Sequence, residues 1–416
     1  MLSRVANSLY WMSRYIERAD NTARLVETSL QLLLDIRNLD DHHVAQQWLP
    51  IVQAAGDEEA FSKLHPKATG AAVTEFLVFQ PQNPNAIVQC ICQARENARM
   101  VRDQITIELW EELNRLYLFV TSREARQVWK QSPSDFFSEI KAASMHLTGI
   151  AYATLIHNEG WWFTQAGRFL ERADKTSRIL DVRHQSLPAT GIPGAISQGE
   201  ALEWAAILRS CSAWDAYKSI NGADVHPVAV TEFLVLSEDF PRSIRFCAAQ
   251  VNTALRKISG VPDGRFVNAA ERHAGRLLAE LQFGTVEEIF ERGLHACLDD
   301  LQLKFNRIGD ALFEAYFFLS FAALSEADFV QQEEQQQQQG APGAEASHAW
   351  FSVSCPGVGW VDFDPTNNLL PSDEPITVAC GRDFSDVSPV SGILVGGGSH
   401  AIPVAVEVRE GEEGPA

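Results

Sequence analysis

An internal repeat organises most of this chain. The block RYIERADNTAR at residues 14–24 returns as RFLERADKTSR at residues 168–178, which is 154 residues later. The block VTEFLV at residues 73–78 returns unchanged at residues 230–235, and Pro84 returns as Pro241, both 157 residues later. Matched blocks at a nearly constant spacing indicate a duplicated unit. Each copy has roughly 155 residues, the size of an ordinary domain.

Both copies have the pattern of amphipathic helices. In residues 12–26 the apolar side chains recur every three or four positions, and the charged side chains occupy the opposite face. Residues 168–180 repeat this division, and another helix is expected over residues 93–116. Prolines lie between such runs and rarely inside them. We therefore expect a mainly α fold in which two related helical bundles, residues 1–152 and 153–325, follow one another.

The composition changes after residue 325. Residues 326–344 are rich in glutamine and poor in apolar residues, so a linker is expected there. Residues 345–416 contain short strand-like runs at 348–354, 359–364, 376–379 and 402–408, separated by turns with glycine and proline. The tail is predicted to form a small β appendage, although about 75 residues is little for an independent β core.

The balance of charge excludes some classes of partner. The chain has 54 acidic and 34 basic residues, a net charge of −20. Nucleic acids and anionic membranes are recognised by clustered cations, so we expect neither as a partner. No metal or other cofactor is expected, because the histidines lack ligand spacing with nearby thiols or carboxylates. The seven cysteines imply no disulfide framework and the N-terminus lacks the features of a secretory signal, which favours a cytoplasmic setting.

The charged face of the repeated helix is a candidate binding site. Five charged positions are kept in both copies: Arg14, Glu17, Arg18, Asp20 and Arg24 in the first, and Arg168, Glu171, Arg172, Asp174 and Arg178 in the second. Solvated positions should drift after a duplication, so their retention indicates that these side chains have partners. Either arginines hold carboxylates in a structural lattice, or the two faces form a pocket for an anion or carboxylate between the copies. A second charged helix carries Arg95, Glu96 and Arg99.

Residues 1 to about 325 resemble the bacterial alpha-E family. The resemblance rests on the repeated ERAD-x-T blocks, on ARENAR at residues 94–99 and on LDDLQLKFNR at residues 298–307. It implies a helical protein to which no reaction is firmly attached. Such proteins are often linked to ATP-grasp ligase-like and transglutaminase-like proteins, which implies partners of these two kinds and a peptide or amide-bond context.

The tail is similar to the C-terminal half of transglutaminase-like domains. The matching motifs are SHAW at 347–350, PGVGW at 356–360, DFDPTN at 362–367 and GRDFSDVSP at 381–389. The resemblance implies that His348 is the base that activates a cysteine nucleophile and that Asp364 orients this histidine. The nucleophile motif itself is missing before His348. Cys297 is the candidate for a displaced nucleophile. Cys355 is not expected to serve, because it lies seven residues after His348, roughly 20 Å along an extended strand and on its opposite face.

Three functions follow from these features. The one that the sequence favours is a non-catalytic interaction or accessory protein of an ATP-grasp or transglutaminase-like system, whose tail accepts the missing front half from another chain. The alternative is an active cysteine hydrolase or acyltransferase that uses His348 and Asp364 with a displaced or partner-supplied cysteine. The second alternative is a binding module for small anions or carboxylates on the repeated arginine and glutamate face.

Overall fold

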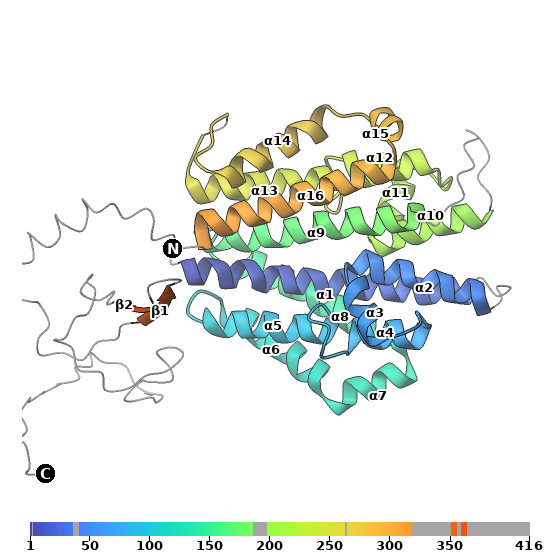
Figure 1. Ribbon diagram of the computed structural model, residues 1–416, viewed down its shortest axis with the longest axis horizontal. Helices are drawn as coiled ribbons and strands as arrows, with labels where there is room; N and C mark the ends of the chain where they lie inside the picture. Colours follow the sequence, from blue (N-terminus) through green and yellow to red (C-terminus); the bar gives the residue numbers. More distant parts are fainter. Residues whose placement is uncertain are drawn as a thin grey trace, which may run out of the picture. The chain divides into compact units, whose positions relative to one another are not determined.

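The computed structural model describes residues 1, 3–35, 41–185, 198–262 and 264–317, together with 351–355 and 359–363. The chain divides into two compact units, Met1–Leu319 and Ser320–Ala416. The first unit is helical, which confirms the predicted mainly α fold (Figure 1). Within the described residues, no helix is both long and apolar enough to cross a membrane.

The helices of the first unit fall into two series. The first series is α1 (Ser3–Asp35), α2 (Asp41–Ala55), α3 (Glu58–Leu64), α4 (Gly70–Val78), α5 (Ile87–Met100), α6 (Ile107–Thr121), α7 (Arg123–Gln131) and α8 (Pro133–Thr154). The second is α9 (Glu159–Gln185), α10 (Gln198–Ser210), α11 (Trp214–Asn221), α12 (Pro227–Leu236), α13 (Ile244–Ser259), α14 (Ala269–Phe283), α15 (Val286–Arg292) and α16 (Leu294–Leu312), which continues into the π-helical turn η1 (Phe313–Phe317). The repeated blocks occupy matching places, because residues 14–24 and 168–178 lie in α1 and α9, and the two VTEFLV segments lie in α4 and α12.

Side-chain caps explain where many of these helices begin. A Ser, Thr or Asn side chain at the N-cap accepts a hydrogen bond from a free backbone N–H of the first turn. This occurs at Thr69, Thr106, Ser122, Ser132, Ser243, Asn268 and Thr285. Thr285 and Glu288 form a full capping box at the start of α15.

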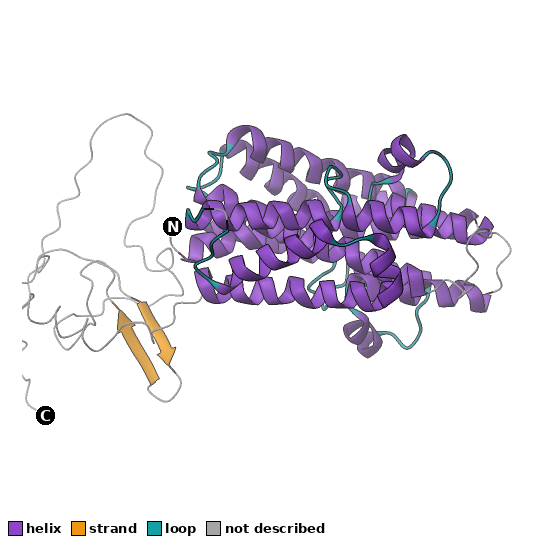
Figure 2. Ribbon diagram, turned by 90° about the horizontal axis from the view of Figure 1, so that it is seen from above, coloured by secondary structure: helices purple, strands orange, loops and turns teal. Residues whose placement is uncertain are grey.

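Helices α1 and α9 lie side by side at the centre of the helical unit (Figure 1). Figure 2 shows that the described part of this unit consists of helices joined by loops. Helices α5 and α8 pack on α1, whereas α13 and α16 pack on α9. The second helix of each series crosses to the other series, so that α2 contacts α9 and α10 contacts α1. The segments divided at residue 152 in the sequence thus share one compact unit and one continuous core.

A glycine permits the close approach of the two central helices. A Cβ atom on Gly167 of α9 would lie 2.4 Å from the carbonyl oxygen of Tyr10 and 2.6 Å from the hydroxyl of Ser13, both in α1. Those distances are shorter than any real carbon contact, so any larger side chain would push the helices apart. The charged faces described below meet directly beside this crossing.

In the second unit the structure describes one β-hairpin. Strands β1 (Phe351–Cys355) and β2 (Gly359–Phe363) pair antiparallel, with Phe351 opposite Phe363 and Val353 opposite Val361. They overlap two of the four strands expected in the tail, at 348–354 and 359–364. The other two expected strands and the glutamine-rich linker lie outside the described residues. A hairpin alone does not support a folded β appendage, so that part of the predicted fold stays a prediction.

Candidate functional site

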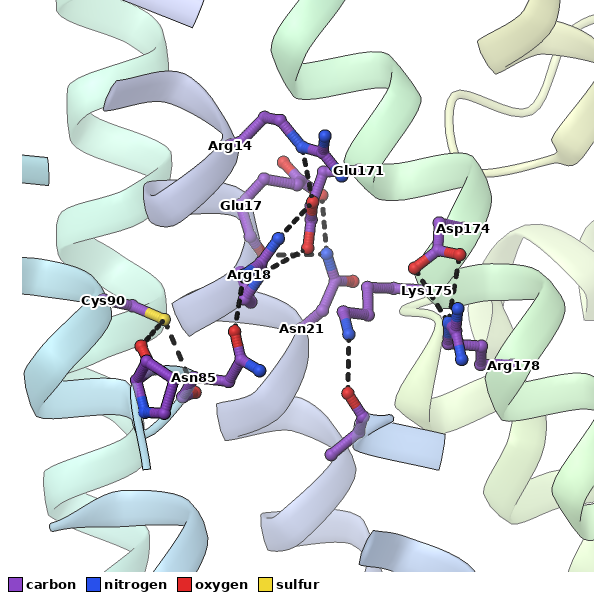
Figure 3. A network of polar contacts seen from close by, with 12 residues as sticks. Arg14, Glu17, Arg18, Asn21, Asn85, Cys90, Glu171, Asp174, Lys175 and Arg178 are labelled. Atoms are coloured by element: carbon purple, nitrogen blue, oxygen red, sulfur yellow. Dashed lines mark hydrogen bonds and ion pairs between the residues drawn. The ribbon is translucent and has the colours of Figure 1, made fainter. Parts of the chain in front are cut away.

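The conserved charges of the two repeats meet between α1 and α9. Figure 3 shows Arg14 and Arg18 of α1 converging on Glu171 of α9. Glu171 is fully buried and accepts hydrogen bonds from Nε of Arg14 at 2.8 Å, and from Nε and Nη2 of Arg18 at 2.6 and 3.0 Å. Arg18 also donates to the side-chain oxygen of Asn85 at 2.5 Å. Such charge-assisted and bidentate contacts are the strongest hydrogen bonds that side chains form.

The reciprocal contact is formed by Glu17. Its two carboxylate oxygens accept from Nε and Nη2 of Arg172, each at 2.7 Å, and one of them also accepts from Arg242 at 3.2 Å. Glu17 is buried like its counterpart. The glutamate of each repeated Glu-Arg pair is therefore held by the arginine of the other pair, across the boundary between the two central helices.

Arg24 and Arg178 each pair with the aspartate four residues earlier in their own helix, and Arg24 also donates to a residue of the other half. Nε of Arg24 donates to Asp20 at 2.9 Å, and its Nη1 donates to the hydroxyl of Ser212 at 2.6 Å. Nε of Arg178 donates to both oxygens of Asp174, at 2.9 and 3.0 Å. The charged face of α1 and α9 is thus a network that ties the two halves together.

Burial and the neighbouring arginines shift the pKa values of Glu17 and Glu171 in opposite directions. Burial disfavours the ionised form of Glu17, but the charges of Arg172 and Arg242 outweigh it and lower the pKa of Glu17 to about 2. Burial likewise opposes ionisation of Glu171, and the charges of Arg18 and Arg14 move its pKa well below the usual range. Both carboxyls therefore remain ionised at any physiological pH.

The sequence repeat did not reveal two charged members of the network, Arg242 and Lys175. Arg242 occupies the position of Asn85 in the first half, and Lys175 occupies that of Asn21. Arg242 donates to Asp20 at 2.7 Å and to Asn21 at 2.8 Å, and Lys175 donates to the backbone oxygen of Ala55 at 2.9 Å. One signal for Arg242 was present in the sequence, because it directly follows the repeated proline.

The two halves differ at Arg14 and its counterpart Arg168. Arg168 does not contact the glutamate of the other repeat; it donates to Gln165, and its Nε has no hydrogen-bond partner among the described residues. Burial and the neighbouring charge of Arg172 lower the pKa of Arg168 to about 10. The network thus carries a poorly compensated cation in its second half.

Helix α5 holds the second charged group of the sequence, apart from this network. Arg95 donates to Glu96 at 2.5 Å and to Asn114 of α6 at 3.3 Å, and Arg99 donates to Glu96 at 2.9 Å. The Arg95 guanidinium also lies over the ring of Tyr117, with its carbon 4.9 Å from the ring centroid. These charges stabilise the packing of α5 against α6.

Of the three residues predicted for catalysis, Cys297 alone lies within the described residues. Cys297 is buried in α16, its thiol lies 3.6 Å from the backbone oxygen of Ile289, and burial raises its pKa. A nucleophilic thiol needs a lowered pKa, so this surrounding disfavours the role proposed for it. His348 and Asp364 lie outside the described residues.

The other described thiols are equally poor nucleophiles. Burial raises the pKa of Cys90, Cys211 and Cys247 to about 12 and also raises that of Cys92. Within the described parts of the chain, no group of three or more His, Cys, Asp or Glu side chains is placed to hold a metal ion. The helical unit therefore offers buried ion pairs in place of a thiol or metal centre.

Comparison with known proteins agrees with the resemblance of the helical part. Over 316 residues the chain is 24% identical to uncharacterized protein Rv2567 of Mycobacterium tuberculosis and to uncharacterized protein Mb2597 of Mycobacterium bovis. Each match covers 72% of this chain but only 34% of the relative, so the chain spans about a third of the length of these proteins.

A second set of relatives matches a shorter stretch. Uncharacterized protein Rv2569c of M. tuberculosis is 39% identical over 71 residues, which is 16% of this chain and 23% of the relative. No solved structure matches the chain. The model of the Alpha-E family, described as an α-helical domain with a conserved ER motif, matches residues 1–317. The chain therefore belongs to the Alpha-E family.

Proposed function

We propose that this chain is a non-catalytic interaction or accessory protein of a peptide or amide-bond system. The observation that carries the proposal is the reciprocal pairing of Glu17 with Arg172 and of Glu171 with Arg18. Acids and bases that act on a substrate must be free to touch it. Here the charged groups that the family motif supplies are buried against one another and stabilise the fold.

We further propose that the Glu-Arg pairs of the two repeated blocks are the ER motif of the family, and that the helical unit arose by duplication. The same order of helices in α1–α8 and α9–α16 supports the duplication. In this view the motif is kept because each copy completes the ion pair of the other. A change in one copy leaves a buried charge in the other copy unpaired.

The comparisons support a role within a larger assembly. The long relatives carry about twice as much additional chain as the part that matches, since the match covers 34% of their length. In M. tuberculosis the long match and the short match fall on two different proteins. The shorter match has about the length expected for the transglutaminase-like tail, residues 345–416. We therefore propose partners of the ATP-grasp and transglutaminase-like kinds, in the cytoplasm.

The first experiment separates this proposal from the enzymatic alternative. Native protein is labelled with iodoacetamide at several pH values, the modified cysteines are located by mass spectrometry, and the His348→Ala variant is treated in parallel. The proposal expects no thiol that reacts rapidly below pH 8 in either protein. A thiol that is reactive in the wild type and loses this reactivity in the variant would establish a working cysteine–histidine pair and overturn the proposal.

The second experiment tests the partner directly. The purified chain is mixed with the ATP-grasp-like protein of the same organism and run on size-exclusion chromatography with light scattering. The proposal expects a complex with the summed mass, and independent elution of the two proteins would contradict it. Amide hydrolysis that appears only when a transglutaminase-like chain is added would instead favour the alternative of a partner-supplied cysteine.

One observation favours the remaining alternative, a module that binds small carboxylates. Most of the repeated arginines are enclosed between the helices, but Arg14 also lines a cavity of the helical unit. Arg14 and Asp174 are therefore the residues of the repeated face that line this cavity.

A further inference from the structure

The cavity beside Arg14 has the size of a ligand site. It has a volume of about 430 Å³ and is lined by residues of α1, α9, α16 and the π-helical turn η1. Sites for small molecules have volumes of about 300–1,000 Å³ and mostly apolar walls with a few polar groups. π-Helical turns are frequent at functional sites, and here the turn places Phe313 and Phe317 on the cavity.

Aromatic rings form much of the wall. Tyr10 and Trp11 of α1 and Phe305 of α16 line the cavity together with the two phenylalanines of η1. The rings of Tyr10 and Phe317 lie in tilted contact, with their centroids 5.4 Å apart. Such a wall binds apolar groups and is also attractive to a cation placed over a ring face.

Arg14 provides a fixed positive group at this wall. Its Nε is bound to Glu171, its Nη1 donates to the hydroxyl of Tyr10 at 3.1 Å, and its guanidinium carbon lies 4.9 Å from the ring centroid of Trp11. Its Nη2 has no hydrogen-bond partner in the part of the chain that the structure describes. Because Glu171 also neutralises Arg18, one carboxylate is shared by two cations. An additional carboxylate would complete the charge balance.

Two carboxylates lie on the same cavity. Asp310 of α16 is exposed and forms no ion pair with any described residue. Asp174 has a single arginine partner, Arg178, whereas its counterpart Asp20 has two. The difference arises because Arg242, the second partner of Asp20, is an asparagine at the matching place in the other half. The cavity thus combines one cation with two incompletely neutralised acids.

The matching position in the other half lacks these features. Thr164 and Gln165 stand at the positions that correspond to Tyr10 and Trp11. Arg168, the counterpart of Arg14, does not line this cavity. Both halves therefore have the arginine, but Tyr10 and Trp11 have no aromatic counterparts in the second half. Arg168 is for this reason a matched control for substitutions of Arg14.

We infer that this cavity binds a small zwitterion with an apolar side group, either a free amino acid or the end of a short peptide. The carboxylate of the ligand is bound by Arg14, its ammonium group by Asp310 with Asp174, and its side group by the aromatic wall. This inference goes beyond the proposed function, since it concerns a ligand of this chain alone and not a protein partner.

Isothermal titration calorimetry of the full chain tests the inference. The probes are L-phenylalanine, glycyl-L-phenylalanine, N-acetyl-L-phenylalanine, which lacks the ammonium group, and L-phenylalanine amide, which lacks the carboxylate. One molecule of a zwitterionic probe should bind per chain, and both blocked probes should bind about tenfold more weakly or worse, because each loses a charge-assisted contact. Tighter binding of phenylalanine indicates a free amino acid, and tighter binding of the dipeptide indicates a peptide end.

Three substitutions test which side chain binds the ammonium group of the ligand and which binds its carboxylate. Asp310→Asn changes an exposed residue, so the variant should fold normally. It should weaken the binding of the zwitterionic probes about tenfold and leave the binding of N-acetyl-L-phenylalanine unchanged. Arg14→Lys should weaken every probe that has a carboxylate, whereas Arg168→Lys should change none. The inference is overturned if no zwitterion binds at millimolar concentration, if blocked and unblocked probes bind equally, or if the two arginine variants behave alike.

Discussion

Arg172 holds Glu17 through two parallel N–H donors, with both N–O distances at 2.7 Å, although 155 positions separate them in the chain. Arg18 holds Glu171 in the same way from the opposite side. The two contacts are reciprocal, so α1 and α9 cannot separate without exposing two carboxylates and several guanidinium groups at once. The pairing makes the two repeats one folding unit.

Removing one of these carboxylates should strongly destabilise the helical unit. In Glu171→Gln the side chain keeps its shape, but Arg14 and Arg18 lose their shared negative partner in a buried position. Breaking a buried pair in this way costs about 3–5 kcal/mol. Urea unfolding followed by circular dichroism would measure the loss.

The control for this prediction is an exposed pair. Glu59 and Lys63 form an i,i+4 ion pair on the surface of α3, with side chains 86% and 70% exposed. Exposed pairs contribute little, so Glu59→Gln should leave the urea midpoint unchanged. Equal effects of the two substitutions would show that the central network does not stabilise the fold.

The stability of the helical unit should fall in acid. The folded-state pKa of Glu17 is about 2, below its ordinary value of 4.5, so the unfolded chain binds more protons between these two values. The ionised Glu17 contributes its full share to the free energy of unfolding above pH 4.5, and this share is lost as the pH falls toward 2. For one carboxyl, the free energy of unfolding falls by up to about 1.4 kcal/mol per pH unit.

Urea titrations between pH 7 and pH 3 would check this dependence. The wild-type midpoint should decline below pH 4.5, and Glu17→Gln should decline less steeply because one of the responsible carboxyls is gone. Parallel curves for the two proteins would show that Glu17 does not contribute.

The approach of the two central helices should depend on one glycine. Gly167→Ala places a methyl group 2.4 Å from the backbone of Tyr10, so α1 and α9 must shift at the ion pairs. We expect a loss of about 1–3 kcal/mol, as for other overpacked cores. Gly149→Ala is the matched control: this helical glycine has no atom within 4 Å of the added carbon. It should gain about 0.5–1 kcal/mol from helix propensity.

The turn after α10 should contain local strain. Ser212 has a φ of 51°, in the region that glycine tolerates best, and Gly56 takes the matching position after α2 with a φ of 85°. Ser212→Gly and Ser212→Ala both lose the hydroxyl that accepts from Arg24, but only the glycine relieves the strain. In thermal unfolding, Ser212→Gly should therefore be more stable than Ser212→Ala by about 1 kcal/mol. The reverse order would show that the strain is negligible.

The helical class of residues 1–317 and the positions of the central helices could be predicted from the sequence alone. Helices are built from local hydrogen bonds and from an apolar period of 3.6 residues, and both are visible along the chain. Comparing the two copies also identified most charged positions of the network, because charges that pair in both copies are retained in both. Arg242 and Lys175 were missed, since each has an asparagine at the matching place.

The choice of partner for each charge, in contrast, depends on how the helices pack. Glu17 could have paired with Arg14 or Arg18 of its own helix, and nothing local indicates that its partner is Arg172 instead. The contacts of α2 with α9 and of α10 with α1, and the cavity beside Arg14, have no signal in the sequence either. Each depends on how helices more than a hundred residues apart pack in space, and that packing is set by side-chain shape and buried charge together over the whole unit.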